Sequence, residues 1–150
     1  MNKEAQIILM VEDNPDDYMA AQRAFNRSSL VNPLVWCERA EQALDYLNQR
    51  GDYTGAAYKG VPGVILLDLN LPGMNGQEFL VEIKQDSSLQ RIPVIVISSS
   101  DDPEDINRCY DYGASSYVLK PVVLDNFLQA VQRLSGYHLE LEVLPAETAV

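Results

Sequence analysis

Five short apolar runs divide the chain, and no other feature of the sequence limits the fold as strongly. They occupy residues 7–11, 34–37, 64–67, 93–97 and 116–119. Apolar and polar residues do not alternate within these runs, so the corresponding strands are expected to be covered on both faces, as in a parallel sheet. We therefore expect five buried strands in a layered domain.

A helical pattern follows each apolar run. Apolar side chains recur with the spacing of an amphipathic helix in the segments 40–47, 76–83, 106–113 and 124–134. The helix after the first run has a clear start, because Asn14 can cap it, Pro15 suits its first position, and Asp16 and Asp17 favour its positive dipole end. The order (βα)5 predicts an open, doubly wound α/β sheet of five parallel strands.

Acidic residues outnumber basic ones by 22 to 11, which gives a formal net charge of -11. This balance disfavours nucleic acid, whose binding depends on lysine and arginine, and an anionic membrane surface. No apolar run approaches the length of about 18 residues that crossing a bilayer requires. We expect a soluble cytoplasmic protein with two buried thiols, Cys37 and Cys109. Residues 1–136 would form a single domain, and residues 137–150 a short C-terminal extension without an output domain.

The polar residues at the ends of the apolar runs carry the chemistry. In an open α/β sheet, ligands bind beyond the carboxyl ends of the strands. The first run is followed by Glu12 and Asp13, the third by Asp68, the fourth by Ser98 and the fifth by Lys120. All five side chains are therefore expected at one edge of the sheet.

Three carboxylates at one edge repel one another, so either a pKa rises or a cation lies among them. Carboxylate oxygens without histidine or cysteine suit Mg²⁺, which commonly serves phosphate chemistry. A carboxylate can be the nucleophile that forms an aspartyl phosphate. Lys120 would add positive charge at the phosphoryl oxygens, and the Ser98 hydroxyl could bond one of them. These residues supply the parts that phosphoryl transfer to a carboxylate needs.

Each residue also has an ordinary structural role when it is considered alone. Asp68 could cap the next turn, Glu12 and Asp13 could form a solvated acidic turn, Lys120 could be a surface lysine, and Tyr117 could belong to the core. The gathering of the acidic residues and the lysine at one edge favours a functional site.

Four motifs, in this order, resemble the receiver domain of two-component response regulators, which has the CheY-like, flavodoxin-like fold. They are VEDN after the first strand, ILLDLNLPGMNG around the third, VIVISSS at the fourth and GASSYVLKP at the fifth. The resemblance covers residues 6–135. A narrower likeness, carried by VEDNPDD, DLNLPGMNG, YDYGASSYVLKPV and the ending HLELEVLP, is to the stand-alone regulators paired with cyanobacterial phytochromes.

The resemblance implies a role for each matching residue. Asp68 would accept the phosphoryl group, and Mg²⁺ would be held by Glu12, Asp13, Asp68 and the backbone carbonyl of Asn70. Ser98 and Tyr117 would form the switch, and Lys120 would bind the phosphoryl group, aimed inward by a cis peptide before Pro121. The chain departs from the family pattern at Ser98, where threonine is frequent, and at Asn75, where aspartate is usual. The second change is expected to affect only the turn.

A receiver domain would take its phosphoryl group from a sensor histidine kinase, and the narrower likeness makes a phytochrome a candidate. It would not be an enzyme in the usual sense, because it would catalyse only its own Mg²⁺-dependent phosphorylation and dephosphorylation. The signal would leave by protein–protein contact through the fourth helix, fifth strand and fifth helix, where Tyr110, Tyr112 and Phe127 are candidate contact residues. Both tyrosines are expected to be partly buried. The same face and the tail could also pair two copies of the chain.

Three other functions fit parts of the pattern. A phosphohydrolase of the haloacid dehalogenase kind would need a second acid two residues after Asp68, where the chain has Asn70. A flavodoxin-like flavin binder would need a loop rich in serine, threonine and glycine where the chain has EDNPDD. A phosphorylation-independent pseudo-receiver would not need the complete acidic set and Lys120.

Overall fold

Strands and helices alternate along the chain in the computed structural model, which describes residues 7–27, 32–55, 61–121 and 123–132. The elements are β1 (Ile8–Val11), α1 (Pro15–Arg27), β2 (Leu34–Cys37), α2 (Ala40–Asn48), the 3-10 turn η1 (Gly51–Tyr53), β3 (Val64–Asp68), α3 (Gly76–Gln85), β4 (Val94–Ser98), α4 (Pro103–Asp111), β5 (Ser116–Leu119) and α5 (Leu124–Gln132). All five predicted strands are present, with ends within one residue of those predicted. The predicted tail at 137–150 lies outside the described residues.

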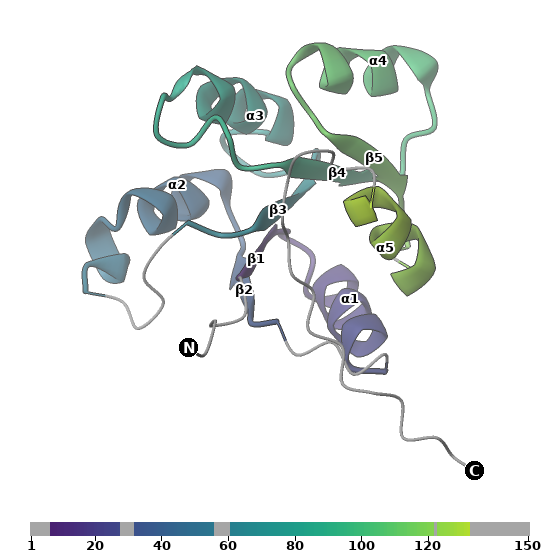
Figure 1. Ribbon diagram of the computed structural model, residues 1–150, viewed down its shortest axis with the longest axis horizontal. Helices are drawn as coiled ribbons and strands as arrows, with labels where there is room; N and C mark the ends of the chain where they lie inside the picture. Colours follow the sequence, from purple (N-terminus) through teal and green to yellow (C-terminus); the bar gives the residue numbers. More distant parts are fainter. Residues whose placement is uncertain (1–6, 28–31, 56–60, 122, 133–150) are drawn as a thin grey trace.

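The five strands form one parallel sheet with the order β2-β1-β3-β4-β5, which Figure 1 shows between two layers of helices. The chain passes from β1 to β2 on one side of β1 and then returns to β3 on its other side. Doubly wound sheets bind ligands at such a reversal of strand order, beyond the carboxyl ends of the strands. The topology therefore directs attention to the residues that follow β1 and β3.

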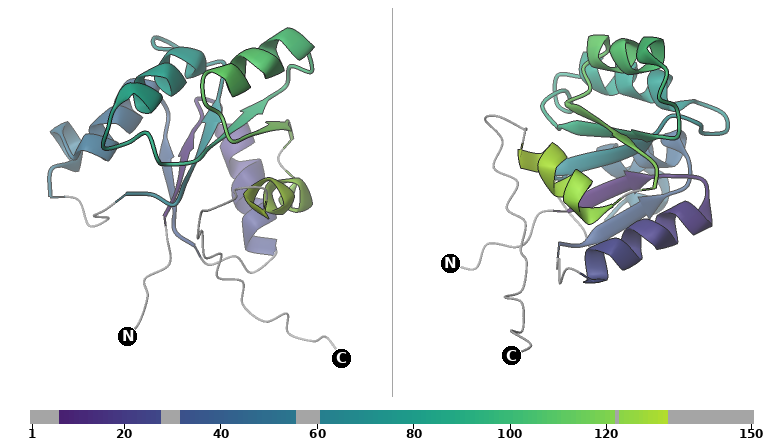
Figure 2. Two further views of the ribbon diagram at one scale, coloured as in Figure 1. Left: turned by 45° about the horizontal axis from the view of Figure 1, so that its top comes forward. Right: turned by 90° about the vertical axis from the view of Figure 1, so that its right-hand side faces the viewer.

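Two apolar cores cover the two faces of the sheet. Helices α2, α3 and α4 lie on one face, and α1 and α5 lie on the other (Figures 1 and 2). The first core joins the strand residues Leu9, Val11, Ile65, Leu67, Val94 and Val96 to Phe79, Leu80 and Ile83 of α3. The second joins Ile8, Met10, Leu66 and Ile95 to Phe25 of α1 and Phe127 of α5. Burial on both faces explains the continuous apolar runs, and it fixes where the residues at the sheet edge emerge.

Two predictions about the face formed by α4, β5 and α5 were wrong. Phe127 is only 1% exposed, and its ring packs against Phe25 with the centroids 4.8 Å apart, because it lies on the side of α5 that covers the sheet. Tyr110 and Tyr112 are 45% and 38% exposed rather than partly buried. The reason is that α4 turns only a narrow stripe, centred on the buried Cys109, toward the sheet.

Capping side chains determine where two of the helices begin. Asn14 Oδ1 accepts a hydrogen bond from the Asp16 N–H at 2.8 Å, as the sequence predicts for the start of α1. Asn75 Oδ1 accepts from the Glu78 N–H at 2.9 Å, and the Glu78 carboxylate accepts from the Asn75 N–H at 3.3 Å. This reciprocal pair is a capping box, so asparagine serves as well as aspartate at this turn.

The two cysteines are free and buried, as expected. Burial raises the pKa of the Cys37 thiol to about 11, so this thiol stays protonated and unreactive at neutral pH. Within the part of the chain that the structure describes, no helix is both long and apolar enough to cross a bilayer.

Candidate functional site

The acidic cluster lies at the carboxyl ends of the neighbouring strands β1 and β3. Val11 pairs with Leu67 across the two strands, so the residues that follow, Glu12 and Asp68, lie side by side. One carboxylate oxygen each from Glu12, Asp13 and Asp68 lies within 4.8 Å of the other two. Glu12 and Asp68 are buried, whereas Asp13 is exposed. The three predicted carboxylates therefore meet, and the cluster is open on the side of Asp13.

Lys120 brings a positive charge to this cluster from the end of β5. Its peptide bond to Pro121 is cis, as predicted. Its Nζ lies 2.8 Å from Glu12 Oε1, 2.8 Å from Asp17 Oδ2 and 3.4 Å from Asp68 Oδ1. The side chain is 18% exposed, so a largely buried cation faces carboxylates from three separate parts of the chain.

Burial is the largest influence on the charges in the cluster. It raises the pKa of Glu12 from 4.5 to about 8; the hydrogen bond to Asp68 and the charge of Asp68 add to this rise, and Lys120 opposes it. Burial lowers the pKa of Lys120, but its contacts with Asp17, Glu12 and Asp68 outweigh this and raise the pKa overall. The buried carboxylates therefore favour an additional positive charge, and their hard oxygen donors fit Mg²⁺.

The loop between β3 and α3 packs tightly behind Asp68. The Asn70 N–H donates to Asp68 Oδ1 at 3.3 Å, and the Gly76 N–H donates to the Leu69 carbonyl at 3.0 Å. A Cβ atom at Gly76 would lie 2.4 Å from the Asp68 carbonyl oxygen, so glycine lets α3 approach the backbone directly. This loop holds the Asn70 carbonyl, which the sequence predicts as a metal ligand.

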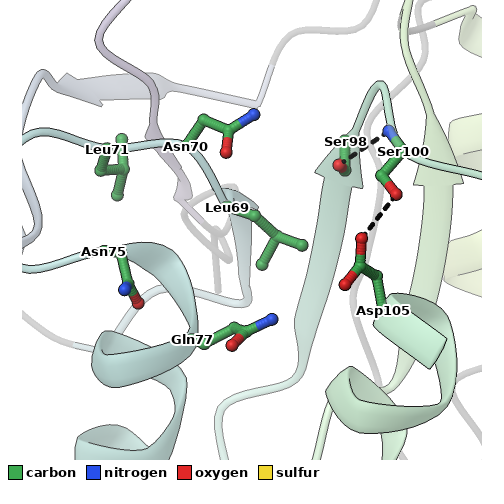
Figure 3. Close-up of a pocket in the computed structure, with 8 residues that line it drawn as sticks. All are labelled: Leu69, Asn70, Leu71, Asn75, Gln77, Ser98, Ser100 and Asp105. Atoms are coloured by element: carbon green, nitrogen blue, oxygen red, sulfur yellow. Dashed lines mark hydrogen bonds between the residues drawn. The ribbon is translucent and has the colours of Figure 1, made fainter. Parts of the chain in front are cut away.

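Ser98 and Tyr117 are linked through Ser100. Ser98 is buried at the end of β4, and its Oγ accepts a hydrogen bond from the Ser100 N–H at 3.1 Å. The Tyr117 hydroxyl donates to the Ser100 carbonyl at 2.7 Å. Ser100 Oγ in turn donates to Asp105 Oδ2 of α4 at 2.7 Å (Figure 3). A movement of Ser98 would therefore displace Ser100, which is hydrogen-bonded to both Tyr117 of β5 and Asp105 of α4.

A pocket of about 280 Å³ lies between the start of α3 and the loop that joins β4 to α4 (Figure 3). The residues that line it are Leu69, Asn70, Leu71, Asn75, Gln77, Ser98, Ser100 and Asp105. It shares Asn70 and Ser98 with the predicted site, so the pocket borders the acidic cluster on the side of α3.

Two residues that support the cluster were not predicted from the sequence. Asp17 was expected only to favour the helix dipole, but it contacts Lys120. The one weak signal for this contact in the sequence is a second acidic pair, Asp16 and Asp17, one helical turn after Glu12 and Asp13. Trp36 Nε1–H donates to the Glu12 carbonyl at 2.7 Å, and Tyr18 stacks on the indole with the centroids 4.2 Å apart. Nothing in the sequence around Trp36 indicates this contact.

Comparison with known proteins agrees with this geometry. The family model of the response regulator receiver domain matches residues 8–132. Response regulator Rcp1 of Synechocystis sp. is 35% identical over 141 residues, which cover 94% of this chain and 94% of the relative. The Mn(2+)-bound crystal structure of Rcp1 has a TM-score of 0.71 and 35% identity, and the match covers 94% of this chain and 99% of that chain.

Two further solved structures are similar. The bacteriophytochrome response regulator AtBRR has a TM-score of 0.84 and 37% identity, over 97% of this chain and 100% of its own. The phosphorylated cyanobacterial phytochrome response regulator RcpA has a TM-score of 0.71 and 39% identity, over 85% of this chain and 89% of its own. Because the family match, the strand order and the acidic cluster all agree, this chain belongs to the response regulator receiver domain family and is similar to the response regulators of phytochromes.

Proposed function

We propose that Asp68 accepts a phosphoryl group from a sensor histidine kinase, and that Mg²⁺ is held by Glu12, Asp13, Asp68 and the Asn70 carbonyl. The observation that carries this proposal is the position of Asp68 between two other carboxylates and the Lys120 ammonium. The Mn(2+)-bound form of Rcp1 and the phosphorylated form of RcpA support it by likeness. A phytochrome is the candidate kinase for the same reason.

The chemistry follows from the arrangement of these side chains. One Asp68 carboxylate oxygen attacks the phosphorus of phosphohistidine, the P–N bond breaks, and the imidazole leaves with the electron pair. When bound, the metal supplies positive charge for the phosphoryl oxygens. Lys120 Nζ, 3.4 Å from Asp68 Oδ1, donates a charge-assisted hydrogen bond to one of them. Water later attacks the acyl phosphate, which releases inorganic phosphate and restores the Asp68 carboxylate.

The phosphorylated state would be transmitted through Ser98. Its side chain turns so that the hydroxyl donates to a phosphoryl oxygen, and this movement takes Oγ away from the Ser100 N–H, which donates to it in this structure. Ser100 then moves, and Tyr117, whose hydroxyl bonds the Ser100 carbonyl, is released to take another position. These groups form a two-state element that the new charge biases. The output is protein–protein contact, with Tyr110 and Tyr112 exposed on the face that would meet a partner or a second copy.

We extend the proposed receiver domain over residues 1–136, with residues 137–150 as a tail, and place the protein in the cytoplasm, where a sensor kinase presents its phosphohistidine. Pairing of two copies through α4, β5, α5 and the tail belongs to the same proposal. Light scattering after size exclusion, with and without phosphorylation, tests the pairing. A single mass for one copy under both conditions would contradict it.

Phosphorylation itself is tested with acetyl phosphate and Mg²⁺, followed by intact-mass measurement. We expect a gain of about 80 Da, the mass of one phosphoryl group on a side chain, that survives acid and is lost in base. Asp68→Asn should give no adduct, and neither should wild type with excess chelator. Asp101→Asn, which removes an exposed carboxylate beyond β4, is the matched control and should be modified normally. Absence of an adduct with both acetyl phosphate and a sensor kinase would refute the proposal.

A further inference from the structure

One carboxylate at the site has no place in the proposed metal set. Asp17, in the first turn of α1, contacts Lys120 Nζ at 2.8 Å, as closely as Glu12 does. It lies outside the group of carboxylates that can share a cation, which consists of Glu12, Asp13 and Asp68. Its side chain is 39% exposed, whereas those of Glu12 and Asp68 are buried.

The contact with Asp17 is not what aims Lys120 at the site. The Lys120 N–H donates to the Ser98 carbonyl at 2.9 Å, which fixes the backbone from which the side chain extends. The buried Glu12 carboxylate then holds the ammonium at 2.8 Å from inside the cluster. Removing Asp17 would leave both of these restraints in place.

The Lys120 ammonium carries three N–H donors, and three carboxylates face it. A phosphoryl group on Asp68 must take one of these donors. Asp17 is the most exposed of the three partners, so water can replace Lys120 around it most readily. Until that exchange takes place, Asp17 draws the ammonium toward α1.

We propose that Asp17 is a positioning residue that competes with the incoming phosphoryl group for Lys120 and so slows phosphorylation of Asp68. The inference rests on the proposed function of Asp68 as phosphoacceptor. The reaction itself is unchanged: the acyl phosphate of the donor loses its phosphoryl group to an Asp68 oxygen and leaves as acetate. Asp17 alters only how readily Lys120 Nζ meets the phosphoryl oxygens.

The chain offers a matched control in the next residue. Asp16 lies on the same turn of α1 and carries the same charge, but it does not contact Lys120, whose three carboxylate partners are Glu12, Asp17 and Asp68. The Asp16 side chain is exposed. Asp16→Asn therefore reproduces the change in net charge without the change in contact.

The experiment compares wild type, Asp17→Asn and Asp16→Asn in saturating Mg²⁺ with acetyl phosphate, and follows the phosphorylated fraction by intact mass. A partly exposed ion pair is weak, so we expect Asp17→Asn to be phosphorylated roughly two- to five-fold faster than wild type, with Asp16→Asn unchanged. Equal rates for the two variants, or a slower Asp17→Asn, would overturn the inference while leaving the proposed function intact. Failure of wild type to form any adduct, with acetyl phosphate and also with a sensor kinase, would instead refute the proposed function, and with it this inference.

A second readout needs neither metal nor phosphorylation. In a 1H–15N spectrum of the lysine ammonium groups, recorded with chelator present, the Lys120 signal should shift and exchange faster with water in Asp17→Asn, because one of its three partners is lost. Asp16→Asn should leave that signal unchanged. An unaltered Lys120 signal in Asp17→Asn would show that Asp17 does not hold the ammonium, and it would overturn the inference independently of the rates.

Discussion

Replacement of Gly76 by alanine tests how closely α3 is packed against the phosphorylation site. Gly76 is the first residue of α3, and an added Cβ would lie 2.4 Å from the Asp68 carbonyl oxygen and 2.7 Å from Leu69 Cα. Both neighbours are backbone atoms, so neither can rotate away as the end of a side chain could. Alanine therefore requires the start of α3 to move away from the end of β3.

The size of the effect follows from two opposing contributions. Alanine is favoured over glycine in a helix by roughly 0.5–1 kcal/mol. Restoring an ordinary contact means increasing the distance to the Asp68 carbonyl oxygen from 2.4 Å to 3.4 Å, a shift of about 1 Å, and forced overpacking of a core costs about 1–3 kcal/mol. We expect Gly76→Ala to lower the free energy of unfolding by about 1–2 kcal/mol, although helix propensity alone predicts a gain.

Urea unfolding measures this free energy, and acetyl phosphate labelling measures the effect on the site. We expect slower phosphorylation in Gly76→Ala, because the shift moves the backbone that carries Asp68 and Asn70. Gly55→Ala is the control: no atom lies within 4 Å of its added Cβ, and its φ of +72° makes alanine unfavourable there, so it should lose about 1 kcal/mol of stability but label normally. A Gly76→Ala protein at least as stable as wild type, with an unchanged rate, would refute the packing argument.

Three further predictions concern the charges and the hydroxyl at the site. Lys120→Met leaves buried carboxylates without their cation, so it should lower the free energy of unfolding in chelator by about 3 kcal/mol and by less in excess Mg²⁺; equal losses in the two buffers would contradict the cluster as a cation site. Because the pKa of Glu12 is raised in the folded protein, the protonated carboxyl adds to the free energy of unfolding. This contribution is complete below pH 4.5 and is lost as the pH rises through about 8. In chelator, wild type should therefore lose stability relative to Glu12→Gln across this range, by at most about 1.4 kcal/mol per pH unit, and a constant difference in urea unfolding would contradict the shift. Tyr117→Phe removes the donor to the Ser100 carbonyl and should cost about 1 kcal/mol in the same assay, whereas the exposed Tyr112→Phe should have almost no effect; similar values for the two variants would show that this hydrogen bond contributes nothing.

The elements and the convergence of the site could be predicted from the sequence because both depend on local patterns. The runs of apolar residues predict the strands, and Asn14 predicts the start of α1. The parallel arrangement then requires that Glu12, Asp68 and Lys120 meet, since the carboxyl ends of all parallel strands lie at one edge of the sheet. No contact between the strands has to be known for this step.

The exposure of individual side chains depends on how each helix is rotated about its axis against the sheet. A narrow row of apolar residues in the sequence does not fix that rotation. Phe127 and Tyr110 both lie in apolar stripes of the sequence, yet the first is buried against Phe25 and the second is exposed. The two residues differ because Phe127 lies on the side of α5 that faces the sheet, whereas α4 contacts the sheet through the stripe around Cys109, which does not include Tyr110.

The sequence by itself determined that this protein has five apolar parallel strands and that their ends carry three carboxylates, a hydroxyl and a lysine. Only the tertiary structure decided the strand order β2-β1-β3-β4-β5 and the partners that hold the site. Asp17 reaches Lys120 across 103 residues of chain, and the indole of Trp36 reaches the Glu12 carbonyl from a neighbouring strand. The apolar sequence of a strand does not indicate which strands lie next to it in the sheet. Contacts between side chains of neighbouring strands and helices are therefore known only from the assembled structure.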